Sequence, residues 1–579
     1  MTDKREVIHI LEELAVLREL MGENPFKVRA FQNAARALQG VSTDLQELVE
    51  KGELTRIRGI GKSIAEVIEE VVRTGKSHDL EELKARIPAG LLEMLKIPGM
   101  GPKKVKAVWE KLGITTVGEL EYACKENRLV DLEGFGAKTQ EKILKGIELL
   151  RKYSERHLLS EARSIAEQVY ERLKQRKEFI RLEIAGSLRR WKETIKDIDI
   201  LGSSSEEHRQ VLMDYFATLP EVETIIAKGS TKTSVVLING INVDLRIVSD
   251  TQFPYALQYF TGSKEHNIAL RELARKQGLK LNEYGLFRNE TENIPCANEA
   301  EIFQQLGLQY IPPEIRENLG EIEAAQKGEI PTLVDWQDIR GIIHVHSHYS
   351  DGANSIEEMA RAAREMGYHY LVISDHSRSA QYANGLSEER IREQHGEIDA
   401  LNEQFTDFRI LKSIECDILP DGSLDYDDNV LASFDLVIAS IHSRFKMSEE
   451  EATERLLRAM SNPHVTIIGH PTGRLLLGRE GYPVNIPRLL QAAAEQGVAI
   501  ELNANPHRLD LDWRWLREAK RLGVRIAIGP DAHQIEGLKD IRYGVGIARK
   551  GWLEKQDVLN CLSAEELLSF ARSRHTSRA

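Results

Sequence analysis

The stretch Ala185–Gly202, AGSLRRWKETIKDIDILG, contains the pattern from which the fold of the middle of this chain is predicted. Gly186 and Ser187 stand between an apolar run and a pair of arginines, and Asp197 and Asp199 then alternate with isoleucines. Side chains two residues apart on a strand point to the same face. The pattern therefore predicts a strand with two converging carboxylates on one face and isoleucines in the core.

A third acid, Asp244, follows with the same alternation in residues 241–246. A Gly-Ser turn, an Asp-x-Asp pair and a later strand aspartate are what a site needs to hold a nucleoside triphosphate with Mg²⁺ and to move its α-phosphorus. Taken alone, Asp197-Ile198-Asp199 could equally be a solvated edge strand. The upstream turn and the acid on a second strand argue against that alternative.

The composition is ordinary for a soluble multidomain protein. The 579 residues leave room for about three to five domains. No apolar run approaches the ~18–20 residues that span a bilayer, and the N-terminus is charged from Asp3 onward, so we expect a cytoplasmic, nucleoid-associated protein without membrane partners. The four cysteines form no CxxC pair, which indicates neither a disulfide framework nor a thiolate zinc site. The net charge of −13 argues weakly against nucleic acid, but Lys103–Lys106 and Arg189-Arg190 are local basic exceptions.

Hydrophobic periodicity separates helical from mixed regions. Residues 1–150 predict short amphipathic helices, and residues 251–318 predict helices followed by strands. Residues 321–336 are polar, contain Pro331 and indicate a connector. Between the helical regions the pattern predicts a helix over 158–174 and strands over 181–185, 197–201, 233–238 and 243–248.

After Asp338 short apolar runs alternate with helical patterns. The seven runs are 341–346, 370–374, 409–415, 434–441, 464–469, 498–502 and 524–529. Strands that alternate with helices pair in parallel and, at this length, close into an α/β barrel. Seven runs suggest an incomplete relative of the eight-stranded barrel, with its active site at the carboxyl ends of the strands.

The helical region repeats one pattern three times: helix, then Gly-x-Gly framed by apolar residues, then a helix with a lysine near its start. The residues are Gly59, Gly61 and Lys62; Gly99, Gly101 and Lys103; and Gly134, Gly136 and Lys138. Glycines allow a tight hairpin that exposes backbone N–H groups, and a helix N-terminus adds positive potential. One such turn is usually structural, whereas three indicate helix-hairpin-helix motifs that hold DNA phosphates without reading sequence.

Histidines and acids gather at the ends of the predicted barrel strands. They are His344, His346, Asp351, Asp375, His376, Glu415, His442, His470, Asp531 and His533. A lone histidine at a strand end is more often structural. A set spread over nearly every strand end is not expected by chance, because only barrel closure makes such distant residues neighbours.

Two further segments complete a family pattern. Residues 259–271 read YFTGSKEHNIALR, and residues 281–287 read LNEYGLF. Together with the features above, they resemble bacterial family X DNA polymerases, whose polymerase core is related to DNA polymerase beta. The histidine-rich barrel resembles the PHP (polymerase and histidinol phosphatase) domain. The resemblance covers essentially the whole chain.

The resemblance implies roles for the carboxylates and the turn. Asp197 and Asp199 would ligate two Mg²⁺ ions, and Asp244 would ligate the catalytic ion only. Ser187 and Arg190 match the family's triphosphate contacts.

It also implies roles within residues 259–271. Tyr259 and Phe260 match the sugar-facing pair that crowds a 2′-hydroxyl, and Asn267 and Arg271 match minor-groove contacts around the nascent base pair. The nucleotide-binding set is completed by Gly262, Ser263, Lys264 and His266. The last two side chains either add triphosphate contacts or form a solvated face.

In the barrel, the resemblance implies nine metal ligands. They map onto His344, His346, Asp351, His376, Glu415, His442, His470, Asp531 and His533. Mixed imidazole and carboxylate ligands suit Zn²⁺ or Mn²⁺. Nine ligands suit three ions, with Glu415 as the bridge. The family commonly has an acid shortly before the first histidine, but Ile342 and Ile343 stand here, so the orientation of His344 is expected to differ.

One position departs from lyase domains like that of polymerase beta. Their Schiff-base lysine corresponds to Val67, which has no amine. Deoxyribose-phosphate lyase activity by that route is not expected. Lys62 lies nearby as a substitute, although as a phosphate contact it needs no further role.

These features predict a DNA-directed DNA polymerase that fills short gaps in repair, including base excision repair, on gapped or primed duplex DNA with deoxynucleoside triphosphates. The barrel is expected to act as a metal-dependent 3′-5′ exonuclease, with 3′-end trimming or cleavage at abasic sites as further activities. The alternatives are a barrel that is a phosphomonoesterase or purely structural, a nucleotidyltransferase for another acceptor, and a non-catalytic DNA-binding scaffold. We expect a monomer.

The predicted fold is a multidomain α and α/β protein: a helix-hairpin-helix region, a polymerase beta-like palm and thumb, and a distorted (β/α)7 PHP barrel. The expected domains are 1–82 (lyase-like, DNA-binding), 83–155 (fingers-type), 156–250 (palm), 251–320 (thumb-type), 321–337 (linker) and 338–579 (PHP).

Overall fold

The structure, a computed structural model, describes residues 4–39, 41, 45–130, 132–151, 156–289 and 291–576. The chain divides into two compact units, Met1–Leu150 and Arg151–Ala579. The expected domain end at residue 155 and the chain end at residue 579 lie outside the described residues.

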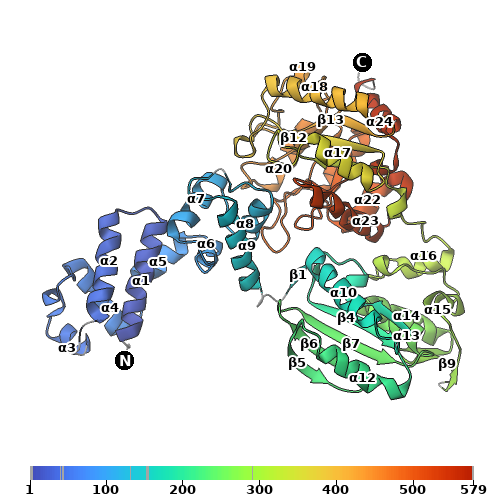
Figure 1. Ribbon diagram of the computed structural model, residues 1–579, viewed down its shortest axis with the longest axis horizontal. Helices are drawn as coiled ribbons and strands as arrows, with labels where there is room; N and C mark the ends of the chain where they lie inside the picture. Colours follow the sequence, from blue (N-terminus) through green and yellow to red (C-terminus); the bar gives the residue numbers. More distant parts are fainter. Residues whose placement is uncertain are drawn as a thin grey trace. The chain divides into compact units, whose positions relative to one another are not determined.

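The first unit is helical throughout its described part, as its periodicity predicts (Figure 1). Its helices are α1 (Lys4–Leu20), α2 (Pro25–Gln39), α3 (Leu45–Glu50), α4 (Lys62–Thr74), α5 (His78–Arg86), α6 (Ala89–Met94), α7 (Pro102–Leu112), α8 (Val117–Lys125) and α9 (Ala137–Arg151). Short helices are marginal alone and depend on a shared apolar core. Here that core includes Leu14 of α1, Ile68 of α4, Val108 of α7 and Ile143 of α9.

The second unit begins with a five-stranded sheet in the order β2-β4-β7-β6-β5. Its strands are β2 (Arg181–Ile184), β4 (Asp197–Ser203), β5 (Val222–Lys228), β6 (Lys232–Leu237) and β7 (Asn242–Val248). The four predicted strands are confirmed within two residues; β5, which is mostly exposed, was not predicted. Strand β4 runs parallel to β7, and the other pairs are antiparallel.

Helices α10 (Leu159–Lys174) and α12 (Glu206–Ala217) cover one face of this sheet. Ile198 and Ile200 of β4 are buried in the core that they form, whereas Asp197 and Asp199 point to the opposite, more open face. The alternation in the sequence thus places the isoleucines in the core and the aspartates on the face that carries the candidate site. The short helix α11 (Gly186–Arg189) follows β2 after one residue. The two-residue strands β1 (His157–Leu158) and β3 (Thr194–Ile195) pair with each other in antiparallel orientation.

A second subdomain follows the sheet. It contains α13 (Phe253–Thr261), α14 (Lys264–Lys276), β8 (Leu279–Asn282), β9 (Gly285–Arg288), β10 (Glu292–Asn293), α15 (Glu299–Gln305) and α16 (Glu321–Lys327). Residues 321–327 were expected in a linker. They form a helix because Ile322, Ala324 and Ala325 bury an apolar face in the core that also contains Leu270 and Phe303.

The remainder of the second unit is a barrel of parallel strands in sequential order from β11 to β17. Figure 1 labels two neighbouring strands of this barrel, β12 and β13. The strands are β11 (Gly341–Val345), β12 (Tyr370–His376), β13 (Arg409–Asp417), β14 (Leu436–Ser440), β15 (Ile467–Ile468), β16 (Ala499–Asn503) and β17 (Ile526–Gly529). A parallel bridge between Val345 and Ala532 brings the first strand to the last, so the barrel is nearly closed. All seven predicted strands are confirmed.

Helices surround the barrel and provide the outer layer of its core. They are α17 (Ile356–Glu365), α18 (Glu388–Gln404), α19 (Asp428–Leu431), α20 (Glu449–Met460), α21 (Ile486–Gln496), α22 (Trp513–Arg521), α23 (Ile541–Lys550) and α24 (Ala564–Thr576). Every residue of β11, β12 and β17 is buried, as parallel strands covered on both faces require.

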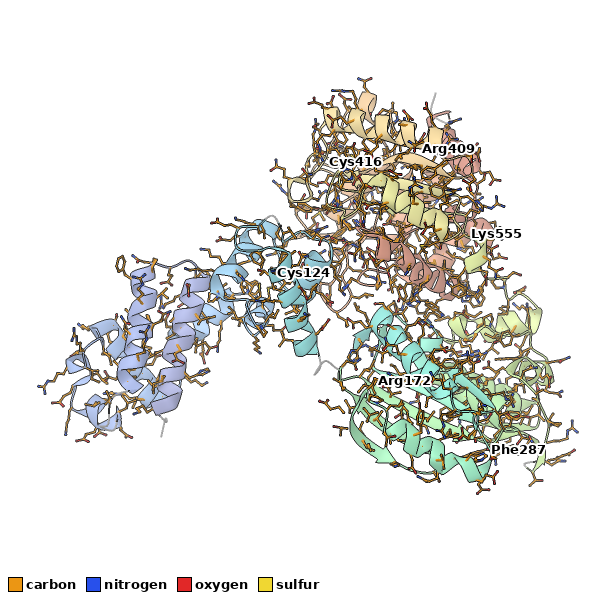
Figure 2. All side chains as sticks on the ribbon, viewed as in Figure 1. Cys124, Arg172, Phe287, Arg409, Cys416 and Lys555 are labelled. Carbon is orange, nitrogen blue, oxygen red and sulfur yellow. The ribbon has the colours of Figure 1, made fainter. Side chains whose placement is uncertain are left out.

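The cysteines are buried free thiols: Cys124 lies in the first unit and Cys416 in the barrel (Figure 2). Cys296 and Cys561 are likewise free, in agreement with the spacing argument. Within the described ranges we find no helix with the length and apolar content that a membrane crossing requires.

Candidate functional site

Three carboxylates meet at one end of the β4–β7 pair. Asp199 is the direct cross-strand partner of Asp244, and Asp197 lies two residues before it on the same face. Burial, followed by the charges of Asp197 and Asp244, raises the pKa of Asp199 to about 7. Carboxylates crowded in this way repel one another, and a divalent cation relieves that repulsion. The donor set therefore fits Mg²⁺.

The glycine turn is pressed against this cluster. Gly186 has φ +64°, and a Cβ at this position would lie 2.2 Å from Oδ2 of Asp199. Only glycine fits both the conformation and the space. The sequence stretch that predicts the fold thus brings the α11 turn and the carboxylates into direct contact.

A lysine that sequence reasoning missed completes the cluster. Lys232 of β6 places Nζ 2.6 Å from Oδ2 of Asp244. The antiparallel register puts Lys232 beside Arg246, two residues along β7 from the acid. The sequence alone does not indicate the pairing of Lys232 with Asp244, because it depends on β6 and β7 being neighbours in the sheet.

The two arginines of the turn differ in their partners. Arg189 pairs with Glu299 at 2.7 Å and donates to Thr261 at 2.6 Å, which makes it a structural link to α13 and α15. Arg190 donates through Nε to Glu317 at 3.1 Å and through Nη1 to the carbonyl oxygen of Thr261. Ser187 lies in α11 between Gly186 and these arginines.

Residues 259–271 form the junction of α13 and α14. The rings of Tyr259 and Phe260 meet edge to face, with centroids 5.1 Å apart. Gly262 ends α13 with φ +71°, and Ser263 caps α14 by accepting from the N–H of His266 at 3.2 Å. This junction lies beside the Arg190 guanidinium, because Nη1 of Arg190 is 3.0 Å from the position of a Cβ on Gly262.

The four residues of α14 that the resemblance assigns to nucleotide binding do not share one environment. Asn267 is buried and donates to the carbonyl oxygen of Tyr259 at 2.7 Å, whereas Lys264 and Arg271 are exposed. His266 is fully buried, with Nδ1 2.7 Å from Oε1 of Glu321. Neither expectation for His266, a triphosphate contact or a solvated face, fits this position, because the ring is fully buried against Glu321 of α16 and lies 6.3 Å from the ring of Phe303.

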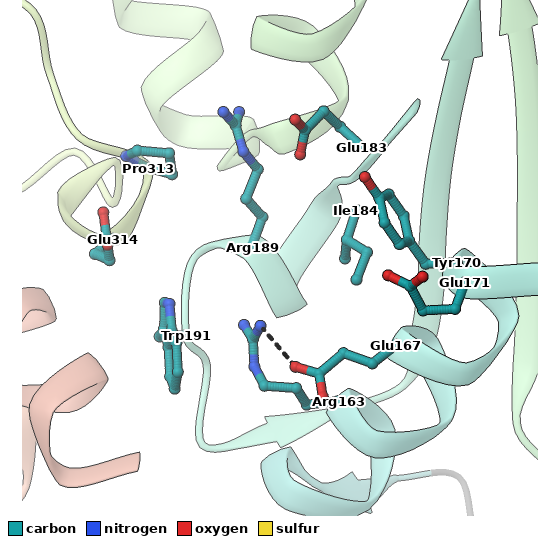
Figure 3. Close-up of a pocket in the computed structure, with 10 residues that line it drawn as sticks. All are labelled: Arg163, Glu167, Tyr170, Glu171, Glu183, Ile184, Arg189, Trp191, Pro313 and Glu314. Atoms are coloured by element: carbon teal, nitrogen blue, oxygen red, sulfur yellow. Dashed lines mark ion pairs between the residues drawn. The ribbon is translucent and has the colours of Figure 1, made fainter. Parts of the chain in front are cut away.

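Beside the turn lies a cavity of about 400 Å³ (Figure 3). Arg163 enters it from α10, 3.8 Å from Glu167 and 4.0 Å over the ring of Trp191. The residues that line it include none of the three carboxylates. We assign it no part in the chemistry.

In the first unit the three glycine hairpins adopt one geometry. The first glycine of each has a left-handed conformation, with φ of +103° at Gly59, +89° at Gly99 and +84° at Gly134. Helices α4, α7 and α9 each begin directly after the second glycine. No described atom lies within 4 Å of a Cβ built on Gly61, Gly99, Gly101, Gly134 or Gly136. Open backbone at a helix N-terminus is the arrangement that a phosphate requires.

The expected barrel ligands converge at the carboxyl ends of the strands. Three groups have ligand atoms close enough to hold an ion: His346, Asp351, His376 and His533; His344, His346, Glu415 and Asp531; and His376, Glu415 and His442. His470 joins them through Nε2, which lies 2.9 Å from Oε1 of Glu415. Glu415 also lies within 3.6 Å of His344, His346, His376 and His442. Glu415 therefore lies at the centre of the histidine cluster.

Unsatisfied atoms indicate what this cluster binds. Among the described residues, His344 Nε2, His346 Nδ1, both ring nitrogens of His376 and Oε2 of Glu415 are buried without a hydrogen-bond partner. Buried polar atoms left unpaired are costly. Burial alone would lower the pKa of His442, but Glu415 and Asp417 raise it to about 10, so the cluster attracts positive charge strongly. The donor set fits transition-metal ions.

Acids behind the ligands orient their rings. Glu501 of β16 lies 2.5 Å from Nδ1 of His344, and Asp417 lies 2.6 Å from Nδ1 of His442. His344 has no acid shortly before it in the sequence, but Glu501 of another strand contacts its Nδ1 instead. Its signal in the sequence was a glutamate inside an otherwise apolar strand run. Asp375, grouped with the strand-end set, accepts from Ser347 and is not in any of the three ligand groups.

Comparisons with known proteins agree with this architecture. Family models match for a helix-hairpin-helix domain at residues 2–77, a SAM-like helix-hairpin-helix tandem at 91–148, the DNA polymerase beta thumb at 256–317 and the PHP domain at 343–505. A probable phosphatase of Thermoanaerobacter sp. is 34% identical over 228 residues, 38% of this chain and 88% of that protein.

The relative named DNA polymerase/3′-5′ exonuclease PolX, from Bacillus subtilis, is 44% identical over 572 residues. The match covers 98% of this chain and 99% of that protein. The chain therefore belongs to the PolX family of DNA polymerase/3′-5′ exonucleases.

Proposed function

We propose that this protein is a DNA-directed DNA polymerase that fills short gaps during DNA repair and carries a 3′-5′ exonuclease in its barrel. The observation that carries the polymerase assignment is the contact of Gly186 with Asp199, opposite Asp244. It joins a phosphate-binding turn to a two-strand carboxylate site in one compact arrangement.

In the polymerase site, Asp197, Asp199 and Asp244 would hold Mg²⁺. When bound, the metal lowers the pKa of a primer 3′-hydroxyl and neutralises the triphosphate. Ser187 and Arg190 orient the triphosphate.

The α13–α14 junction selects the nucleotide. Gly262, Ser263 and the exposed Lys264 border the triphosphate, and Tyr259 and Phe260 crowd the sugar. Asn267 and Arg271 bind the minor groove of the nascent pair. His266 is left out of this set, because it is fully buried against Glu321.

In the barrel, the nine ligands would hold three Zn²⁺ or Mn²⁺ ions. Such ions supply a nucleophilic hydroxide and stabilise the leaving oxygen of a phosphodiester. Glu415 would contribute ligand atoms to more than one ion, and Glu501 and Asp417 would keep Nε2 of His344 and His442 free for the metal. The products are deoxynucleoside monophosphates from a 3′ end, and cleavage at abasic sites uses the same chemistry.

A barrel that acts as a phosphomonoesterase is the second candidate. The observation in its favour is the similarity to probable phosphatases. Attachment to a polymerase favours a DNA 3′ end as the substrate.

The hairpins bind the DNA backbone through the nine glycines and lysines named above. The protein acts as a monomer on gapped or primed duplex, in the cytoplasm and at the nucleoid.

Val67 lies half-buried in the core and offers no amine for a lyase. We retain the domain boundaries given above, but assign residues 321–327 to the thumb-type domain, because α16 packs there.

One experiment on a gapped duplex tests both assignments. Asp199→Ala is expected to abolish primer extension and to leave degradation of the 3′ end intact. His376→Ala is expected to do the reverse. Loss of both activities from a folded single variant contradicts the two-site assignment. Release of inorganic phosphate from a 3′-phosphate without nucleotide release identifies the phosphomonoesterase.

A further inference from the structure

One buried lysine of the barrel contacts the polymerase turn. Lys550, the last residue of α23, is fully buried. Its ammonium donates to the carbonyl oxygens of Arg190 at 2.9 Å and Glu314 at 3.1 Å, and to Oε1 of Glu317 at 2.6 Å. These three bonds use all its hydrogens. A buried charge with a complete set of acceptors holds those acceptors in one geometry.

Glu317 links this lysine to the triphosphate contact. The oxygen that accepts from Lys550 also accepts from Nε of Arg190 at 3.1 Å. The second oxygen of Glu317 lies 3.4 Å from Nζ of Lys192. Arg190 is thus held at its backbone by Lys550 and at its guanidinium by a carboxylate that Lys550 orients.

The neighbouring residue shows how closely α23 fits the turn. Trp191 has φ +55°, and its ring lies against Gly546, where a Cβ would come within 2.1 Å of a ring carbon. The ring of Trp191 also lies 6.5 Å from that of Tyr543, measured between centroids. Helix α23 therefore contacts both Arg190 and Trp191, the two residues that end the turn.

We propose that Lys550 is a positioning residue of the polymerase site, which keeps the Arg190 guanidinium in one orientation for the triphosphate of the incoming nucleotide. This inference rests on the proposed function of Arg190. The barrel thereby gains a second role: in addition to the 3′-5′ degradation proposed at Glu415, its helix α23 supports the turn of the polymerase site. A lysine that merely joined two domains would affect stability and leave nucleotide affinity unchanged.

The test uses the full chain with Lys550→Met. The KM for the deoxynucleoside triphosphate is expected to rise about tenfold, with a much smaller change in kcat, because this pattern results when a binding interaction is lost. Degradation of a 3′ end should stay at the wild-type rate. Lys520→Met is the matched control, because Lys520 pairs with Glu554 at 2.7 Å inside the barrel and contacts no residue of the turn in the described structure.

Glu317→Gln separates positioning from charge and decides the question if Lys550→Met does not fold. Positioning predicts a higher KM for the nucleotide, because a neutral amide holds the Arg190 guanidinium more weakly than the carboxylate does, which leaves the carbonyl oxygen of Thr261 as its stronger partner. A simple charge effect predicts a lower KM, because one negative charge near the triphosphate is removed. A KM that is unchanged or lower in Glu317→Gln overturns the proposal.

Arg190→Gln distinguishes failure of this inference from failure of the proposed function. If Arg190→Gln leaves the nucleotide KM unchanged, Arg190 is not a triphosphate contact. If it raises KM while the Lys550 and Glu317 variants do not, only the positioning role fails.

Discussion

Oε1 of Glu501 lies 2.5 Å from Nδ1 of His344, across 157 residues of sequence. The other oxygen of the same carboxylate accepts from the backbone N–H of His470 at 2.7 Å. One buried acid on β16 therefore fixes the ring of one proposed metal ligand, His344, and the backbone of another, His470. A histidine that donates from Nδ1 keeps Nε2 available for a metal.

Glu501→Gln is expected to lower metal affinity and 3′-5′ degradation about 10–100-fold, as loss of an outer-shell acid does. Primer extension should not change. The check is metal content per chain together with both activities. Glu495→Gln, an exposed glutamate on the neighbouring helix α21, is the control. Wild-type degradation in Glu501→Gln would show that His344 needs no acid behind it.

The sequence predicts the ligands of this site better than their supports. The nine proposed ligands could be recognised because each stands at or just after the end of an apolar run and matches the family pattern, and barrel order makes strand ends neighbours. Glu501 and Lys232 were not predicted. Each contacts a residue of another strand, and the distance between the two side chains depends on strand order and register, which the sequence does not give directly. The expectations for His266 were wrong for a related reason: its partner Glu321 begins α16, a helix with the polar sequence of a connector.

Gly186→Ala tests the polymerase turn. A methyl group here meets Oδ2 of Asp199 at 2.2 Å, and the residue has φ +64°, so either the turn or the acid must move. Extension is expected to fall at least about 100-fold, since misplacement by ~1 Å has that effect. Degradation is the internal control. Gly396→Ala, in open space on α18, should leave both activities intact.

Removal of transition metals should separate the two activities. The barrel offers buried imidazoles and Glu415, whereas the polymerase site offers only carboxylates. We expect dialysis against a strong chelator, followed by return to a Mg²⁺ buffer, to abolish degradation and preserve extension. Zn²⁺ or Mn²⁺ should restore degradation. Degradation that returns fully with Mg²⁺ alone would contradict the assignment of the barrel ions.

Glu299 ties the turn to the thumb-type domain, 2.7 Å from Arg189 and 2.6 Å from Arg316. Burial would raise the pKa of Glu299, but Arg316 and then Arg189 lower it to about 2. An acid whose pKa is lowered on folding stabilises the folded state fully above its unfolded pKa, which is about 4.5 for a glutamate. That contribution is lost as the pH falls towards 2. Glu299→Gln should therefore cost about 3 kcal/mol at pH 7 and progressively less below pH 4.5 in urea unfolding. The exposed Glu323→Gln should cost little. A cost for Glu299→Gln that is independent of pH would contradict the charge argument.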